Sequence, residues 1–223
     1  MNLKIYTSTR ADGSMKSIHD RDAVDTHLSR ARFLEKNSID PAETTLVRLT
    51  YDQGNYLRYF EADSNHKGDG IIRKSTLTSD ALIVTKPNHA LFLPLGDCIG
   101  AVLYDPSQNI LMVSHLGRHN LEQYGGVKSV EYLVEHYMVD PSKLTAWLSP
   151  AAGKNTYPVF AFNNRSLHDI AVQQLRDAGI LLTNIEVSSI DSAEDPAYYS
   201  HSQFLKGSQV DDGRFAIVAI LTD

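Results

Sequence analysis

Short apolar runs separated by polar turns recur along the chain and predict strands. The runs are "LKIYTS" at residues 3–8, "ALIVT" at 81–85, "ALFLPLGD" at 90–97, "CIGAVLY" at 98–104 and "NILMVSH" at 109–115. Further strands are predicted at "LTAWLSP", "NIEVSSI" and "RFAIVAIL". The continuous runs are typical of strands that are buried on both faces. Gly and Asn between residues 46–51 and 56–61 predict a β-hairpin at that place.

Apolar residues at helical spacing predict helices between these strands. One helix is expected from about Asp22 and another from Asn120, a good N-cap residue. Their predicted inward faces are Val24, Leu28, Ala31 and Leu34 in the first, and Val127, Val130, Val134 and Met138 in the second. In "SLHDIAVQQLRDAG", Ser166 and Asp169 resemble a capping box and Gly179 closes the helix.

Composition indicates a globular protein of 223 residues, with 42% hydrophobic and 22% charged residues. The length fits a single domain over residues 1–223, since neither a linker nor a repeat interrupts the pattern. A net charge of −6 without any Lys/Arg run argues against nucleic-acid binding. No apolar stretch reaches the ~20 residues of a spanning helix, so no membrane association is expected.

The lone cysteine and the N-terminal sequence bear on the compartment. The start, "MNLKIYTSTRADG", lacks the apolar region of a secretory signal. A single Cys98 excludes an internal disulfide and fits a reducing compartment. We therefore expect a cytoplasmic location, while the oligomeric state is left open.

Cys98 and His115 are the first candidates for chemistry. If Tyr104 lies opposite Asn109, the antiparallel register places Cys98 directly opposite His115, with Cβ atoms ~5 Å apart. A thiol and an imidazole together suit either a zinc site or a cysteine nucleophile. Spacing alone favours an inert core cysteine and a histidine that caps a turn. Asp97 could orient a neighbouring ligand or cap the strand end.

The turn "SHLGRHN" adds a candidate anion site. It passes from a strand through Gly117 into a predicted helix N-terminus, where unpaired N–H groups attract anions. Arg118 and His119 add positive charge, and Asn120 follows them. The turn could bind a phosphate or a negatively charged intermediate beside His115, and it fits a solvated basic surface equally well.

The central segment resembles a known family. "SDALIVTKPNHALFLPLGDCIGAVLYDP" followed by "VSHLGRHN" is similar to the signature of the bacterial multicopper polyphenol oxidase (laccase-like) family, whose second motif reads "HAGWRG". This family includes the peptidoglycan editing factor and purine nucleoside phosphorylases. The likeness extends to "DRDAVDTHLSRARFL", "LSPAAGKNTYPV", "LHDIAVQQLRDAGI" and "YYSHS…DDGRFAIVAIL", and so covers almost the whole chain.

The resemblance implies a fold and an activity. The implied fold is a single α+β domain with a β-sandwich-like core of mixed sheets flanked by helices, similar to the catalytic domain of cytotoxic necrotizing factor. Implied activities are phosphorolysis of adenosine- or inosine-type purine nucleosides and adenosine deamination, under a laccase-like family label. The implied partners are thus a small nucleoside and phosphate.

The resemblance also implies a zinc site, carried over residue by residue. Cys98 and His115 match the second and third ligands, but Gln53 stands where the family has its first histidine. A neutral amide binds zinc poorly. The expected substitutes are His66 or His201, with His119 third, and each of them is otherwise an ordinary surface histidine. Arg214 in "DGRF" matches a recurring family position and is a further candidate for substrate or phosphate binding, or a structural hairpin arginine.

Three functional hypotheses follow from these residues. The first is a purine nucleoside phosphorylase or deaminase with a Cys/His zinc site. The second is a metal-free Cys–His hydrolase or amidase, motivated by Gln53. The third is a binding or regulatory protein that keeps the fold and has lost the chemistry.

Overall fold

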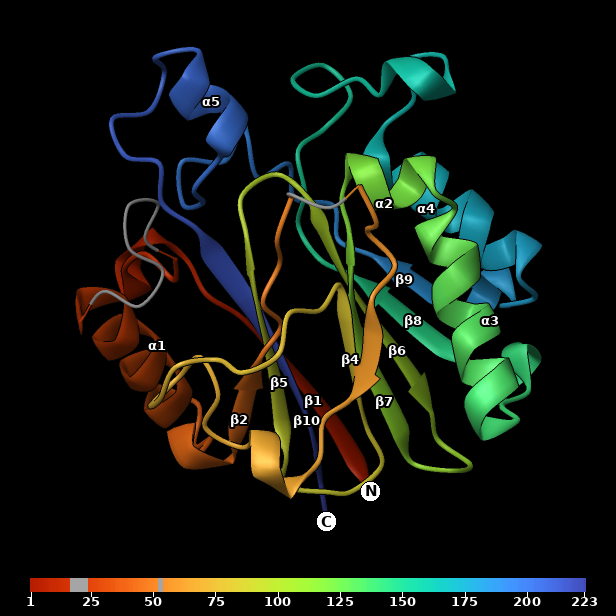
Figure 1. Ribbon diagram of the computed structural model, residues 1–223. Coiled ribbons are helices and arrows are strands. Elements are labelled where there is room, and N and C mark those ends of the chain that lie inside the picture. Colours follow the sequence, from red (N-terminus) through yellow and green to blue (C-terminus); the bar gives the residue numbers. More distant parts are fainter. Residues whose placement is uncertain (17–23, 52–53) are drawn as a thin grey trace.

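Two β-sheets packed face to face form the centre of the protein (Figure 1). The structure is a computed structural model, and it describes residues 1–16, 24–51 and 54–223. The four-stranded sheet has the order β1 (Asn2–Thr7), β10 (Phe215–Thr222), β5 (Ala90–Leu95) and β2 (Thr44–Leu46). The six-stranded sheet has the order β3 (Tyr59–Glu61), β4 (Ala81–Val84), β7 (Ile110–Leu116), β6 (Ile99–Asp105), β8 (Thr145–Leu148) and β9 (Ile185–Val187). Both sheets are mixed, because β2–β5, β3–β4 and β8–β9 are parallel pairs and the other pairs are antiparallel.

Helices cover the outer faces of both sheets. In Figure 1, α1 (Val24–Lys36) lies beside the four-stranded sheet, and α3 (Gly125–Tyr137) and α4 (Leu167–Asp177) lie beside the six-stranded sheet. The short helices α2 (Arg118–Glu122) and α5 (His201–Leu205) lie at the edge opposite the chain termini. Single 3₁₀ turns are η1 (Arg10–Asp12), η2 (Pro41–Glu43), η3 (Ser64–His66), η4 (Pro141–Lys143), η5 (Phe160–Phe162) and η6 (Leu182–Asn184). An α+β domain with two mixed sheets is thereby confirmed, and the likeness to the toxin domain stays a prediction.

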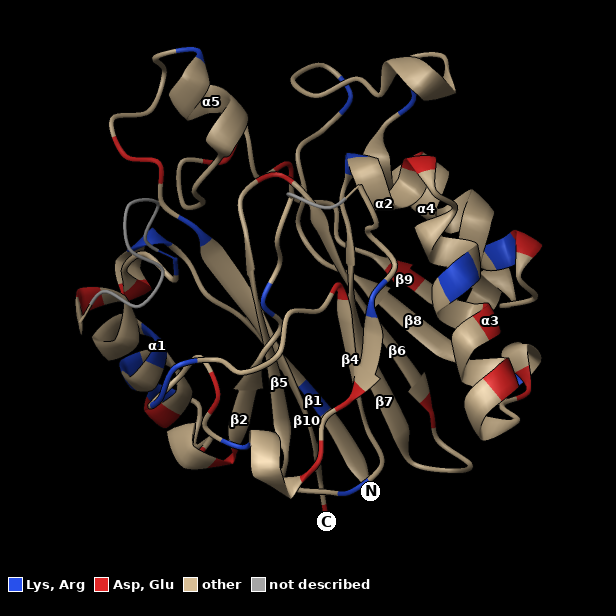
Figure 2. Cartoon of the chain, viewed as in Figure 1, with Lys and Arg blue, Asp and Glu red and all other residues tan. Residues whose placement is uncertain are grey.

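Each interface between layers has its own hydrophobic core. Leu82 and Ile217 belong to the cluster between the sheets, Phe33 to the cluster under α1, and Leu133 and Ile170 to the cluster under α3 and α4. The inner strands β4, β5, β6, β7 and β10 are therefore covered on both faces, which explains their continuous apolar runs, whereas β1, β3 and β9 are partly exposed. Figure 2 shows the charged residues concentrated on helices and loops. In the described part of the chain, no helix combines the length and apolar character needed to cross a bilayer.

The predicted hairpin at residues 46–61 is wrong. β2 pairs in parallel with β5 in the four-stranded sheet, whereas β3 pairs in parallel with β4 in the six-stranded sheet. The segment between them crosses from one sheet to the other, because each strand finds its partner more than 20 residues further along the chain. Local turn residues do not reveal such distant pairings.

The helices are confirmed, but their buried faces differ from those predicted. In α1 the buried residues are Thr26, Arg30, Phe33 and Leu34. Val24 is 73% exposed and Leu28 is 46% exposed. Arg30 is buried because its Nε and Nη1 donate to the carbonyls of Met15 and Gly70. The expected start at Asp22 lies outside the described residues.

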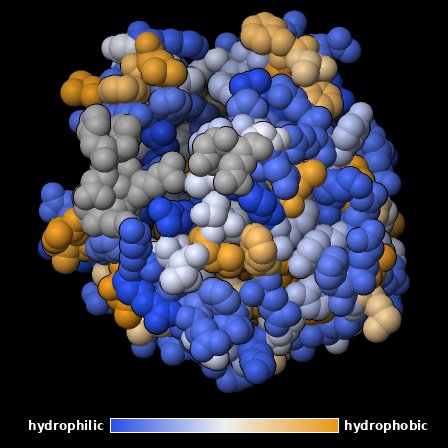
Figure 3. Space-filling view, in the orientation of Figure 1, coloured by the Kyte–Doolittle hydropathy of each residue, from blue (hydrophilic) through white to orange (hydrophobic). Residues whose placement is uncertain are grey.

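The helix predicted from Asn120 is divided in two. Tyr124 adopts a left-handed conformation with φ +60° and separates α2 from α3. In α3 the buried residues are Gly125, Gly126, Ser129, Val130 and Leu133. Val134 and Met138 are exposed instead. The buried face of α3 passes through Ser129, Val130 and Leu133, and these two residues lie outside it. Figure 3 shows this side of the molecule as mostly hydrophilic, with hydrophobic residues in separate small patches.

Candidate functional site

The turn from β5 to β6 and the end of β7 bring Cys98 and His115 to one edge of the sandwich. His115 pairs with Gly100 and not with Cys98, so the predicted register is wrong by two residues. Asn109 has φ +57° and belongs to the connecting turn, so pairing begins further along β7 than predicted. A shift by two residues preserves the side-chain alternation of a strand. Cys98 and His115 therefore still face the same side.

Gly117 supplies the space between the thiol and the imidazole. A Cβ atom on Gly117 would lie 2.8 Å from Cys98 Sγ, 2.7 Å from His115 Cε1 and 3.1 Å from His115 Nε2. The sulfur and the imidazole edge thus converge on one point, which only a glycine leaves open. The backbone of Gly117 has φ −84°, so close approach and not backbone conformation requires glycine here.

Burial makes both groups neutral. Enclosure by protein, with the Asp97 carboxylate nearby, raises the pKa of Cys98 to about 12, although the amide N–H of Arg118 donates to the sulfur. Burial lowers the pKa of His115 to about 4, and Asp80 and an Asn120 hydrogen bond only partly oppose this. Near pH 7 the site therefore holds a thiol and an uncharged imidazole.

The turn that was predicted to bind an anion uses many of its polar groups internally. The helix α2 begins at Arg118, two residues before the predicted start. The amide of Gly117 donates to Asn120 Oδ1 at 3.2 Å, and Asn120 Nδ2 donates to the Tyr56 carbonyl at 2.6 Å. The His119 ring stacks on Tyr56 with the ring centres 4.7 Å apart. The anion role of this turn stays a prediction, with Arg118 as its remaining cationic side chain.

A cavity of about 500 Å³ opens over Cys98 and His115. Its basic lining residues are Lys16, Arg118, His119, His201 and Arg214. Tyr51 and Tyr157 add aromatic surface, and burial raises the pKa of both phenols. The space is of the size that small-molecule sites occupy, and its lining is mixed in polarity.

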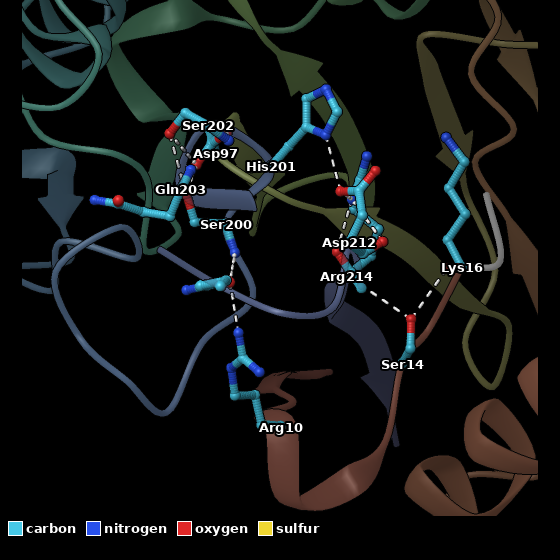
Figure 4. A network of polar contacts seen from close by, with 12 residues as sticks. Arg10, Ser14, Lys16, Asp97, Ser200, His201, Ser202, Gln203, Asp212 and Arg214 are labelled. Carbon is cyan, nitrogen blue, oxygen red and sulfur yellow. Dashed lines mark hydrogen bonds and ion pairs between the residues drawn. The ribbon is translucent and has the colours of Figure 1, made fainter. Parts of the chain in front are cut away.

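Asp97 fixes the loop that carries α5. Its carboxylate accepts hydrogen bonds from Ser200 Oγ at 2.5 Å, from Ser202 N at 2.7 Å and from Ser202 Oγ at 3.3 Å (Figure 4). Asp97 is only 5% exposed. Its predicted catalytic role stays untested, and the geometry gives it a positioning function for this loop.

The histidines expected to complete a zinc site do not converge on Cys98 and His115. His66 lies in η3, where it contacts Asp63 at 2.8 Å outside the cavity lining. His201 lines the cavity, but its Nδ1 is bonded to Asp212 at 2.8 Å.

The described residues do not form a complete zinc donor set. Within residues 1–16, 24–51 and 54–223, no group of three His, Cys, Asp or Glu residues is arranged to hold a metal. Catalytic zinc takes three protein ligands. The described donors, Cys98 and His115, therefore do not by themselves fit zinc, and Gln53 lies outside the described residues.

Several cavity residues were not found from the sequence. Lys16, Tyr51 and Asp212 line the cavity from separate loops. Behind His115, the buried Asp80 pairs with Arg58 Nε at 2.7 Å. In the sequence, the only signal for Asp212 is its position two residues before Arg214.

Solved structures share this fold at low sequence identity. Hypothetical protein YfiH from Bacillus licheniformis is 18% identical, with a TM-score of 0.83 over 99% of this chain and 93% of its own. YlmD from Geobacillus stearothermophilus is 16% identical, with a TM-score of 0.83 over 99% and 92%. Protein NMB0706 from Neisseria meningitidis is 14% identical, with a TM-score of 0.74 over 100% and 95%. No curated protein matches the sequence.

A family model assigns the chain. The model described as multi-copper polyphenol oxidoreductase laccase matches residues 9–222, and this range includes the strands from β2 to β10, the turn at Cys98 and the cavity residues named above. The chain therefore belongs to the multi-copper polyphenol oxidoreductase laccase family.

Proposed function

We propose that this protein is a purine nucleoside phosphorylase. The observation that carries the proposal is the cavity of about 500 Å³, in which cationic side chains and tyrosines surround the neutral Cys98–His115 pair. Phosphorolysis requires a site for an anion beside a site for a flat, uncharged base. The cavity offers both kinds of surface, and family membership supports the same substrate class.

Lys16, Arg118 and Arg214 are the proposed phosphate-binding residues. All three line the cavity. Arg214 Nη1 donates to Asp212 and to the carbonyl of Gly213, which fixes the guanidinium plane. A guanidinium held in this way can present its other edge to phosphate oxygens, and charge-assisted bonds of this kind are the stronger ones.

Tyr51 and Tyr157 are the proposed contacts for the purine. A tyrosine hydroxyl is protonated at neutral pH, so both can donate hydrogen bonds to a purine. Tyr157 is also a hydrogen-bond partner of Arg118, which links the base surface to the phosphate surface. Aromatic rings suit the flat faces of a purine.

Cys98 and His115 are proposed to contact the ribose from the end of the cavity. As an uncharged thiol and an uncharged imidazole they can donate and accept hydrogen bonds without competing for the phosphate. In the reaction, a phosphate oxygen bonds to C1′ of the ribose while the bond from C1′ to the purine nitrogen breaks. The products are ribose 1-phosphate and the free base.

Zinc, which the family resemblance implies, would need a further donor besides Cys98 and His115, and the described residues do not bring one to them. Metal analysis of protein purified without an affinity tag measures its zinc content directly.

A metal-free cysteine nucleophile is less well supported. Attack by Cys98 needs a thiolate, and proton transfer from the thiol to His115 runs against both pKa shifts, to about 12 and about 4. Adenosine deamination is distinguished from phosphorolysis by its product, which is inosine and not adenine. A protein that only binds nucleosides would release neither.

The test is phosphate-dependent release of base. Purified protein is incubated with adenosine or inosine, with and without phosphate, and products are separated by chromatography. We expect free base and ribose 1-phosphate only when phosphate is present. Absence of base release, or release that ignores phosphate, would refute the proposal.

A variant pair sharpens this test. We expect Arg118→Gln to raise the KM for phosphate about ten-fold, the effect of roughly 1.4 kcal/mol of lost binding. The matched control is Arg176→Gln, on the exposed side of α4 and outside the cavity lining. Equal kinetics of the two variants would remove Arg118 from the phosphate site.

A further inference from the structure

A histidine and an aspartate form a bonded pair on the wall of the cavity. His201 Nδ1 lies 2.8 Å from Asp212 Oδ1, and Arg214 Nη1 donates to the same oxygen at 2.5 Å. All three residues line the cavity. Asp212 is 8% exposed, whereas the His201 side chain is 44% exposed. Figure 4 shows the second ring nitrogen of His201 on the side of the imidazole away from Asp212.

Two sets of tethers hold this pair in place. On one side, Ser200 and Ser202 donate to the Asp97 carboxylate. On the other, Arg10 Nη2 donates to Gln209 Oε1 at 2.5 Å, and the amide of Ser200 donates to the same oxygen at 3.0 Å. Hydrogen bonds therefore hold the segment that carries His201 on both sides, and they fix the backbone from which the imidazole extends.

The pair lies next to the turn that carries Cys98. A Cβ on Gly96 would lie 3.2 Å from Arg214 Nε and 3.4 Å from His201 Cβ, so both side chains pack directly on this turn. Ser14 Oγ accepts from the amide of Arg214 at 3.1 Å and donates to the Lys16 carbonyl at 3.0 Å. The histidine is thus on the same wall as two of the proposed phosphate-binding cations.

We propose that His201 is the general acid that protonates the purine as it leaves, and that Asp212 is its positioning residue. The inference rests on the proposed function and adds a residue role to it. In its doubly protonated form, His201 donates Nδ1–H to the Asp212 carboxylate and directs Nε2–H outward, which is the arrangement that proton donation to a leaving group requires.

The proton and electron balance of this step is complete. When the C1′–N9 bond breaks, its electron pair passes into the purine ring, and His201 Nε2–H transfers its proton to N7. The attacking HPO₄²⁻ loses its proton on becoming the ester dianion, and that proton restores His201. No oxidant, reductant or further reactant is involved.

The other histidines of the cavity are less suited to this role. Burial lowers the pKa of His115 to about 4, so it is an uncharged imidazole near pH 7 and lacks the imidazolium form that acts as an acid. His119 is stacked on Tyr56, and burial together with Arg118 lowers its pKa. Hydrogen bonds from Arg214 and His201 outweigh desolvation and hold the pKa of Asp212 below its usual value, so it stays ionised beside His201.

The experiment compares two leaving groups in the His201→Gln variant. Inosine needs a proton at N7, whereas 7-methylinosine already carries a positive charge on the purine and leaves without one. We expect the kcat for inosine to fall by about 10²–10⁴, the usual range for a lost general acid. The kcat for 7-methylinosine should change by less than about three-fold, since no proton transfer is needed. Asp212→Asn should reduce inosine turnover selectively in the same sense.

The matched control is His136→Gln, at an exposed position of α3 outside the cavity lining. It should leave the kcat for both substrates unchanged. Urea unfolding of each variant checks that the fold is retained. If His201→Gln lowers both substrates equally, or neither, the acid role is overturned while the proposed function stands. If the wild-type protein releases no base from either nucleoside, the proposed function fails and the acid role fails with it.

Discussion

The substitution Gly117→Ala tests the convergence of Cys98 and His115 directly. The added Cβ would lie 2.8 Å from Cys98 Sγ and 2.7 Å from His115 Cε1. Carbon atoms pack best at about 3.5–4.0 Å, so both neighbours must move by several tenths of an ångström or more. His115 is 3% exposed and has little room to move. The backbone at φ −84° accepts alanine, so the effect is one of contact.

The expected loss of stability follows from these contacts. Overpacking of a buried site costs about 1–3 kcal/mol. For a chain of this length each kcal/mol lowers Tm by roughly 2–4 °C, which gives a fall of roughly 2–12 °C. The measurement is urea unfolding monitored by circular dichroism, with Tm as a second reading.

A double-mutant cycle separates this contact from an effect on the helix cap. Gly117 is also the N-cap of α2, and alanine is a poor cap wherever the sulfur lies. In a Cys98→Ala background the sulfur is gone, so we expect the cost of Gly117→Ala to fall by about 1 kcal/mol. The same cost in both backgrounds would show that the thiol does not face Gly117. The geometric basis of the site would then be wrong.

Three further predictions follow from single groups. Because the Cys98 thiol keeps its proton, its carboxymethylation between pH 7 and 9 should be more than about ten-fold slower than that of free cysteine. The rate should be the same in the His115→Ala variant. Fast labelling that depends on His115 would contradict this. Ser166→Ala should lower the free energy of unfolding by about 1 kcal/mol in urea, because Ser166 Oγ accepts from the Asp169 amide at 3.0 Å, and Ser166→Asp should restore it. Burial lowers the pKa of His89 to about 4, so between about pH 6.5 and 4 the unfolded chain binds a proton that the folded chain does not. The free energy of unfolding should therefore fall by up to about 3 kcal/mol as the pH falls across this window. The variant His89→Gln should flatten this pH profile.

The sequence predicts those parts of the fold that depend on local burial. The runs at 81–85, 90–97, 98–104 and 109–115 are strands because both of their faces are covered, and continuous apolar residues report that directly. The capping box at Ser166 is confirmed for the same local reason. The false hairpin at 46–61 shows the limit, because turn residues carry no information about which sheet a strand joins. The buried Arg30 shows another, since its carbonyl partners lie far along the chain.

In the candidate site too, the sequence predicts the residues on strands and misses those on loops. Cys98 and His115 lie at the ends of predicted strands, and the predicted register was wrong by two residues only because Asn109 belongs to the turn. Lys16 and Asp212 come from loops and reach the cavity through hydrogen bonds of Ser14, Arg214 and their neighbours. Loop positions of this kind depend on the whole tertiary structure, and neither residue type nor spacing in the sequence predicts them.

If the proposed function holds, the charges of the cavity should favour phosphate over water as the attacking group. Among its described lining residues, Lys16, Arg118 and Arg214 face two carboxylates, Asp97 and Asp212. Both carboxylates accept hydrogen bonds from protein donors, Asp97 from serines and Asp212 from Arg214, so their charge is already stabilised without a ligand. The three cations exceed the two carboxylates by one charge, so an anion entering this cavity gains net attraction, whereas neutral water gains far less. Hydrolysis of the same nucleosides should therefore be slow next to phosphorolysis, and raising the ionic strength should weaken phosphate binding more than nucleoside binding.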